Sequence, residues 1–198
     1  MSPVAAKSLR LRFFAAAHYA ATTLLIRTFK NESFVKIGPW GHSSGVTFDE
    51  IGLGNVKQIV ICYDADGINF IQMAYKLNGT VSLGGRHGGT VSVGHTFDSI
   101  TFAPDEYLSS INGSYGVFNQ HCKAAIKSLE FTTNKMTYGP FGCKQALPFF
   151  FNFDFANNLC GFHGRYSGNH LVAIGVYVKI LSARPKLEFN AINHLTLH

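Results

Sequence analysis

Charged side chains are scarce in this chain of 198 residues, since Asp, Glu, Lys and Arg together make up only 14% of it. Proline is also uncommon, at six residues, and a single tryptophan is present. Low charge combined with 46% hydrophobic residues excludes a disordered chain and predicts a globular protein with one sizeable core. Twenty glycines and eighteen phenylalanines, with few long helix-forming side chains, favour an all-β fold.

Acidic residues are absent from the start of the chain, where the first carboxylate is that of Glu32. Five basic residues precede it, which leaves twelve basic and ten acidic residues after residue 34, out of 17 and 11 in total. The body of the protein is therefore nearly neutral. Because it has no basic stripe that could follow a phosphate backbone, we expect no binding to nucleic acid.

Residues 1–33 form a basic, Ala-rich extension that differs in composition from the rest of the chain. Its apolar stretch from Phe13 to Ile26 is too short and too mixed to span a membrane. We expect the extension to be disordered, helical or a transit-like signal, with secretion as a further alternative. A transit signal would direct the protein to an organelle; otherwise we expect a cytoplasmic protein.

The four cysteines are Cys62, Cys122, Cys143 and Cys160. No C-x-x-C pair occurs among them, and none pairs with a histidine at zinc-finger spacing. We expect buried free thiols, and disulfides only if the chain is exported.

Neither a metal site nor a cofactor is expected, because the histidines are scattered. The carboxylates show no spacing typical of an acid and a base facing one cleft, and no nucleophile signature occurs. We therefore expect that the protein is not an enzyme.

From Phe34 onward, short alternating segments are separated by glycine-rich turns, which predicts a closed or multi-sheet β architecture. Turns are predicted at Asp64–Gly67 and at Asn78-Gly79. The alternating phenylalanines 149, 151, 153 and 155 are typical of a core stripe. Glycines predict loops at Gly84–Gly89, from Asn112 to about Lys123, and from Gly161 to the strand that begins near Ile174. Strands are predicted at Gln58–Tyr63, Phe70–Leu77, Phe97–Phe102 and Ile126–Thr133.

Seven short motifs follow one another along the body of the chain. They are Val35-Lys-Ile-Gly-Pro-Trp-Gly41, Pro104-Asp-Glu-Tyr-Leu108, Gly113-Ser-Tyr-Gly116, Lys127-Ser-Leu-Glu-Phe-Thr-Thr-Asn134, Tyr138-Gly-Pro-Phe-Gly142, Gly161-Phe-His-Gly-Arg165 and Ala173-Ile-Gly-Val-Tyr177. In this order the motifs resemble those of the jacalin-related plant lectins, and the resemblance covers residues 34–181. The chain runs unbroken through Pro39, Trp40 and Gly41, where the galactose-preferring members are cleaved, so it resembles the mannose-type, unprocessed single-chain members.

This resemblance implies a β-prism of three four-stranded Greek-key sheets with pseudo-threefold symmetry. Residues 182–198, after the matching region, show no clear periodicity, and we expect a C-terminal tail there. It also implies binding of glycans or glycoproteins at one end of the prism, without metal or catalysis. Homo-oligomers are usual in the family. The sugar is expected between three loops, here Gly41–Gly45, Gly116–Cys122 and Gly168–Val172.

The third loop carries a Gly-x-x-x-Asp motif in the family, and here Val172 stands in place of the aspartate. Losing a charged acceptor costs about 1.5–3 kcal/mol of binding free energy, so we expect a weakened or altered mannose/glucose-type site. The alternative is a degenerate lectin fold that serves as a protein-interaction or oligomerisation module. The candidate carbohydrate-binding residues are Gly41, His42, Gly168, Asn169, His170, Leu171 and Val172.

Overall fold

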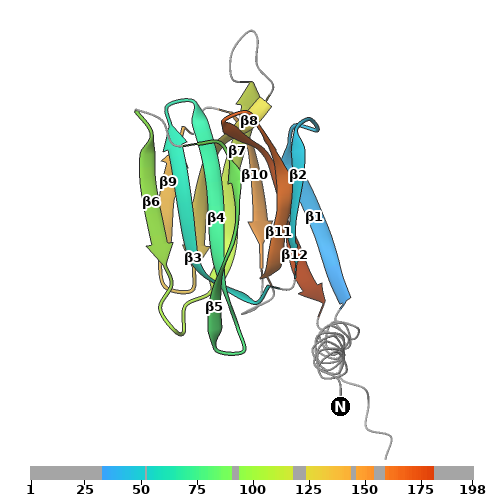
Figure 1. Ribbon diagram of the computed structural model, residues 1–198, viewed down its shortest axis with the longest axis vertical. Helices are drawn as coiled ribbons and strands as arrows, with labels where there is room; N and C mark the ends of the chain where they lie inside the picture. Colours follow the sequence, from blue (N-terminus) through green and yellow to red (C-terminus); the bar gives the residue numbers. More distant parts are fainter. Residues whose placement is uncertain are drawn as a thin grey trace, which may run out of the picture.

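The computed structural model describes residues 33–51, 53–90, 94–117, 124–143, 146–153 and 159–180. Residues 1–32 of the basic extension, the tail at 182–198, most of the predicted second loop and Phe155 lie outside the described residues. The described chain forms twelve strands and no helix (Figure 1). Their bounds are Ser33–Gly41 (β1), Val46–Ile51 (β2), Asn55–Asp64 (β3), Gly67–Leu77 (β4), Thr80–Gly88 (β5), Thr96–Thr101 (β6), Leu108–Val117 (β7), Ala124–Thr133 (β8), Thr137–Gly142 (β9), Leu147–Asn152 (β10), Leu159–Ser167 (β11) and His170–Ile180 (β12).

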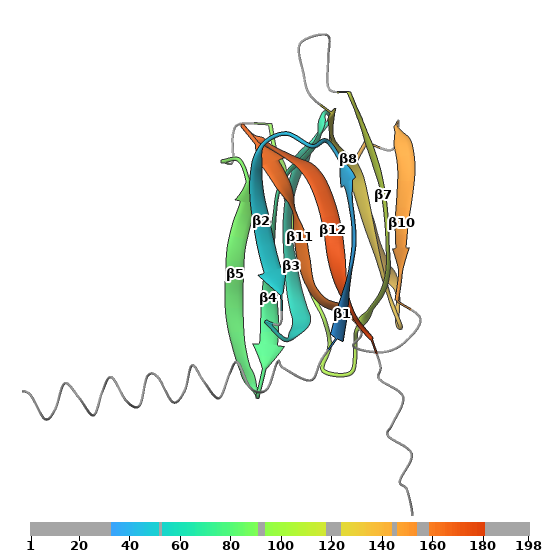
Figure 2. The ribbon, with the colours of Figure 1, turned by 90° about the vertical axis from the view of Figure 1, so that its right-hand side faces the viewer.

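The strands form three antiparallel four-stranded sheets, as predicted. Sheet A has the order β1-β12-β11-β2, sheet B β5-β4-β3-β6 and sheet C β10-β7-β8-β9. In sheets B and C three hairpin-connected strands are followed by a fourth that returns beside the first, which is the Greek-key order. Sheet A has the same order only if β11 and β12 are counted before β1 and β2, so segments from both ends of the chain complete it (Figure 2).

The core lies between the three sheets and is rich in aromatic rings. Phe149 and Phe151 are buried and Phe150 is 71% exposed, which confirms the predicted alternation in β10. Phe131 and Tyr75 are fully buried on β8 and β4. Each buried large side chain contributes about 1.5–3 kcal/mol of transfer free energy, so the aromatic rings and the aliphatic side chains packed with them both stabilise the core.

Both predicted turns connect strands of sheet B. Asn78 and Gly79 have φ angles of 51° and 85°, the pair of positive values that a two-residue hairpin turn requires. At the other end, Asp64 Oδ1 accepts hydrogen bonds from the backbone N–H of Asp66 at 2.7 Å and of Gly67 at 3.1 Å. A side chain that accepts hydrogen bonds from the backbone N–H groups of the following residues stabilises a tight turn between two strands.

Three glycine-rich segments predicted as loops are strands instead. Gly84–Gly88 lies in β5, Asn112–Gly116 in β7, and Gly161 and Gly164 in β11. Their glycines leave room for close neighbours. A Cβ on Gly84 would lie 2.7 Å from Glu50 Oε1, and one on Gly161 would overlap the Glu50 carbonyl oxygen. The sequence pattern cannot distinguish this need for space from a turn.

The repeated Gly-Pro-aromatic-Gly motif marks equivalent places in two sheets. Gly38-Pro39 lies in edge strand β1 and Gly139-Pro140 in edge strand β9, and both peptide bonds are cis. At both places the strand register shifts against its neighbour. Proline is tolerated there because an edge strand has backbone N–H groups that pair with no neighbouring strand.

Candidate functional site

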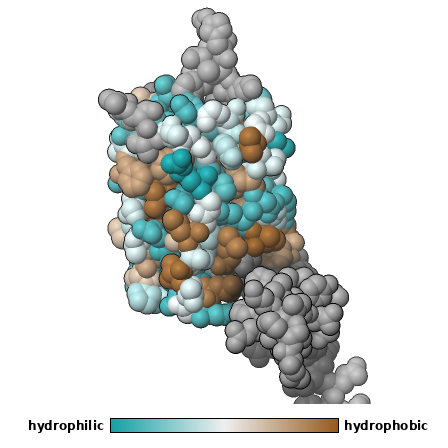
Figure 3. Space-filling model, viewed as in Figure 1, coloured by the Kyte–Doolittle hydropathy of each residue, from teal (hydrophilic) through white to brown (hydrophobic). Residues whose placement is uncertain are grey.

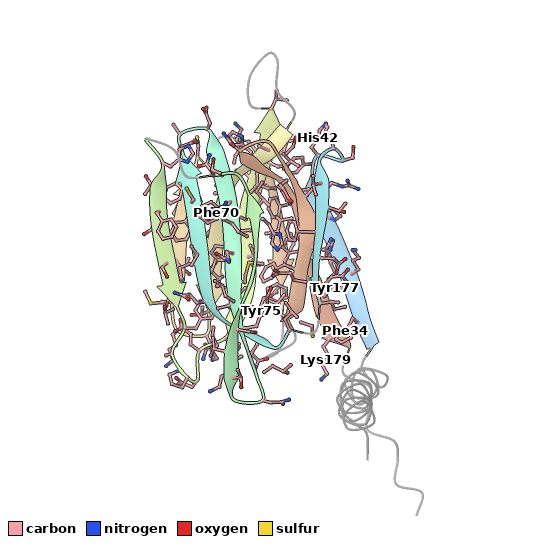
Figure 4. The ribbon with its side chains drawn as sticks, viewed as in Figure 1. Phe34, His42, Phe70, Tyr75, Tyr177 and Lys179 are labelled. Carbon is pink, nitrogen blue, oxygen red and sulfur yellow. The ribbon has the colours of Figure 1, made fainter. Side chains whose placement is uncertain are left out.

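Two of the predicted loops meet at one corner of sheet A, where β1 ends and β12 begins. The backbone N–H of His42 donates to the Val172 carbonyl at 2.8 Å, and Gly41 pairs with Ala173. Gly41 has a φ of 125°, and a Cβ on it would overlap the Val172 carbonyl oxygen. We call residues Gly41–Gly45 and Gly168–Val172 the sheet A corner; His42 marks its position in Figure 4.

The first loop of this corner is ordered by its own polar groups. Ser44 donates its backbone N–H to His42 Nδ1 at 3.1 Å, and the Ser44 hydroxyl lies 2.7 Å from the same nitrogen. Because a backbone N–H can only donate, Nδ1 is the acceptor and the neutral ring carries its proton on Nε2. Arg165 Nη1, from β11, donates to the Gly45 carbonyl at 3.3 Å and fixes the far end of the loop.

The second part of the corner is the tight β11–β12 hairpin rather than a long loop. Gly168 and Asn169 form its exposed turn, and Gly168 has a φ of 57°. His170 is half-buried, whereas Leu171 is fully buried in the core and Val172 is 3% exposed. Of the seven candidate residues, the structure thus places Gly41, His42 and Val172 in contact, with the Gly168-Asn169 turn beside them.

The same corner is built three times. The Gly89 N–H donates to the Asn69 carbonyl at 3.1 Å in sheet B, and the Cys143 N–H donates to the Lys127 carbonyl at 2.8 Å in sheet C. Each donor follows a glycine of positive φ, Gly88 or Gly142, just as His42 follows Gly41. Asn69 and Lys127 therefore occupy the positions in sheets B and C that correspond to Val172.

The side chains at these two equivalent positions brace neighbouring hairpins. Asn69 Nδ2 donates to the Asn169 carbonyl at 3.4 Å, and Lys127 Nζ donates to the Asp66 carbonyl at 2.8 Å. Asn169 and Asp66 are themselves equivalent turn residues of sheets A and B. An aliphatic side chain such as that of Val172 can donate no such bond, so the sheet A corner differs chemically from the other two.

Comparison with known proteins agrees with this architecture. Residues 37–177 match the family described as the jacalin-like lectin domain. The chain belongs to the jacalin-like lectin family. Jacalin-related lectin 3 of Arabidopsis thaliana is 38% identical over 163 residues, which cover 82% of this chain and 26% of that protein. A mannose/glucose-specific lectin of Parkia platycephala is 39% identical over 153 residues, which cover 75% of this chain and 32% of that protein.

Among solved structures, a mannose-specific jacalin-related lectin from Morus nigra in complex with mannose matches with a TM-score of 0.69 and 31% identity. The match covers 76% of this chain and 97% of that chain. This chain therefore spans about a quarter to a third of the two sequence relatives and nearly all of the solved lectin. These findings confirm both the predicted family and the predicted β-prism.

A buried carboxylate network in this jacalin-like domain had no signal in the sequence pattern. Glu50, on β2 of sheet A, accepts hydrogen bonds from Tyr75 Oη at 2.7 Å, from the Gly85 N–H at 2.6 Å and from His87 Nε2 at 2.9 Å. The Phe48 ring stacks on His87 at 3.8 Å between centroids. Because the donors come from β4 and β5, the network joins sheets A and B below the corner.

The jacalin-like domain also has a hollow on the outer face of sheet C. It has a volume of about 200 Å³. The Ser114 and Ser128 hydroxyls on its floor lie 2.7 Å apart, and Asn112 Nδ2 donates to Glu130 Oε1 at 3.2 Å. Donors and acceptors there are already matched to each other, so the hollow is a weaker candidate than the corner.

The described ranges contain neither a cluster of metal-ligating side chains nor a helix that could cross a membrane. No group of three or more His, Cys, Asp or Glu side chains among those residues could hold a metal ion. The same residues include no helix long and apolar enough to cross a membrane. Among the described cysteines, Cys62 and Cys143 form no disulfide, and Cys62 is fully buried.

Proposed function

We propose that this chain is a lectin that binds a pyranose unit of a glycan at the sheet A corner, with a mannose/glucose-type site that is altered at Val172. The observation that carries the proposal is the hydrogen bond between the His42 N–H and the Val172 carbonyl. It holds the first loop against the β11–β12 hairpin, so that donors from both segments converge on one small ligand. The relatives named as mannose- or mannose/glucose-specific support this proposal.

The chemistry of the corner suits a hydroxylated ligand but lacks a strong acceptor. The exposed Gly168-Asn169 turn presents backbone groups that can donate to sugar oxygens, and His42 Nε2 adds a side-chain donor. A valine at position 172 accepts nothing from two neighbouring sugar hydroxyls. Losing such charge-assisted bonds weakens binding of a neutral hexose by about 1.5–3 kcal/mol, or roughly 10- to 100-fold. The proposal includes no catalytic step.

The test is calorimetric titration of the full chain with methyl α-mannoside. We expect wild-type binding to be weak and Val172→Asp to bind at least about tenfold more tightly, because the carboxylate restores the missing acceptor. Val81→Asp is the matched control, since it makes the same change at a 58% exposed position on β5. Equal affinity in wild type and Val172→Asp would contradict the proposed placement of the sugar.

A second candidate function is a protein-interaction or oligomerisation module without sugar binding. Hydrophobic side chains interrupt the hydrophilic surface (Figure 3). The edge strands β1 and β10 expose Trp40 to 44%, Leu147 to 61% and Phe150 to 71%. Apolar edge strands are frequent sites of association. A glycan array that stays silent, together with a dimer in light scattering that Phe150→Ser dissociates, would favour this candidate over the lectin.

A further inference from the structure

We propose that the sheet A corner selects a saccharide that carries a carboxylate, a uronic acid unit, over a neutral hexose. This inference rests on the proposed function, because it concerns the ligand class of the same corner. The carboxylate of the ligand would lie on the side of the first loop, against His42 and Arg165.

The corner carries no acidic side chain of its own. The two segments that build it, residues 41–45 and 168–172, contain no Asp or Glu but include His42 and His170. Arg165 of β11 adds a positive charge against the first segment, through its bond to the Gly45 carbonyl. With Val172 in place of a carboxylate, the corner is rich in donors and poor in acceptors. A neutral hexose presents hydroxyl hydrogens that need acceptors, whereas a uronate presents two carboxylate oxygens that only accept. The polarity of the corner therefore fits the acidic sugar better.

The side-chain donors beside the first loop are held in place by hydrogen bonds to the loop backbone. The Ser44 N–H donates a hydrogen bond to His42 Nδ1. The half-buried imidazole of His42 therefore has its proton on Nε2, where it can serve as a donor. Arg165 uses one of its five N–H groups for the Gly45 carbonyl, which holds its guanidinium beside the same loop. A guanidinium and an imidazole N–H are strong partners for a carboxylate. Because both are held by the loop backbone, little side-chain entropy is lost on binding.

Two acidic groups act on the hairpin part of the corner. His170 is close enough to Asp64 and Asp66 of the β3–β4 turn for both to act on its charge, as do Lys127 and His95. Asp64 is engaged there, since it accepts hydrogen bonds from Asn69 Nδ2 and from two backbone N–H groups. A ligand anion at His170 would meet this negative charge, which is why the carboxylate is placed against His42 and Arg165 instead.

The experiment compares three probes on the full chain by calorimetry: trigalacturonate, its fully methyl-esterified form, and mannotriose. Esterification removes the charge and keeps the ring stereochemistry. We expect trigalacturonate to bind at least about tenfold more tightly than its ester and to weaken as NaCl rises from about 50 to about 500 mM. Equal affinity for the charged and esterified trimers would overturn the inference.

Three variants locate the effect. Arg165→Gln removes the guanidinium charge, and it should weaken trigalacturonate at least about fivefold while the ester is unchanged. Val172→Asp adds a negative charge at the corner and should reverse the preference in favour of mannotriose. Val81→Asp, with the same net charge far from the corner, should behave as wild type. Trigalacturonate binding that survives unchanged in both Arg165→Gln and Val172→Asp would contradict the proposed placement.

The result for the neutral probe separates this inference from the proposed function. If wild type binds mannotriose but not trigalacturonate, the lectin function stands and the acidic preference is wrong. If no probe binds and Val172→Asp also binds none, both are wrong. Circular dichroism of each variant confirms that a loss of binding is not a loss of fold.

Discussion

Glu50 is almost fully buried, unlike an ordinary surface carboxylate. Burial acts to raise its pKa, but the hydrogen bonds from His87, Tyr75 and Gly85 outweigh burial and hold the pKa below its ordinary value. A carboxyl whose pKa is lower in the folded state contributes stability above its unfolded pKa of about 4.5. That contribution is lost as the pH falls through the lower, folded-state pKa. The same sign applies to Asp64 and Glu106.

Glu50→Gln tests this network. We expect it to lower the free energy of unfolding at pH 7 by about 2–4 kcal/mol, because a neutral amide leaves at least one buried donor of Tyr75 or His87 poorly paired. The variant should also show a shallower fall in stability between about pH 5 and 3 than wild type. Urea denaturation across this pH range measures both effects. Glu130→Gln, a partly exposed control on β8, should cost less than about 1 kcal/mol; equal costs would contradict the assignment.

Among the strands and turns, the sequence pattern predicts the glycines that form tight turns but not those that make room for neighbouring strands. Alternation and the Asn78-Gly79 pair correctly predicted β4 and its hairpin, because these signals are local. Glycines in β5, β7 and β11 were wrongly interpreted as loops, because their role is to admit side chains or carbonyls from other strands. Glu50 was missed for the same reason, since its donors are 25 to 37 residues away in the sequence.

A pair of Gly→Ala substitutions distinguishes backbone strain from close packing. Gly79 has a φ of 85° with open space around it, whereas Gly41 combines a φ of 125° with close contact to Val172 and Ala173. We expect Gly79→Ala to cost about 1–2 kcal/mol and Gly41→Ala more than about 3 kcal/mol. Chemical denaturation of the two variants provides the comparison. Similar costs would mean that the β1–β12 contact is looser than described.

At the scale of the whole molecule, sheet A depends on segments from both ends of the chain. β1 covers the edge of β12 from Ser33, which pairs with Ile180, to Gly41. The family motifs predicted this prism and the approximate position of the corner, because they cover residues 34–181. They could not predict how the Asn69 and Lys127 side chains brace the neighbouring hairpins, since those contacts depend on the packing of all three sheets.

Deletion of residues 1–41 should therefore cost far more stability than deletion of residues 1–32. Without β1, the strand β12 becomes an exposed edge, and its buried Ile174 and Val176 lose cover, so we expect aggregation or loss of a cooperative transition. The shorter deletion leaves all twelve strands and should keep a cooperative thermal transition. Differential scanning calorimetry distinguishes the two, and equal melting of both proteins would contradict the role assigned to β1.

The central claim is that a saccharide binds at the sheet A corner, and residue-resolved NMR tests it most directly. Uniformly ¹⁵N-labelled protein is titrated with methyl α-mannoside and with trigalacturonate, and the shifts of assigned backbone amides are followed. We expect the largest shifts on His42–Gly45 and Gly168–Val172, and Val172→Asp should enlarge those caused by the mannoside. Shifts centred on the outer face of sheet C around Ser114 and Ser128, or no shifts with either sugar, would contradict the claim.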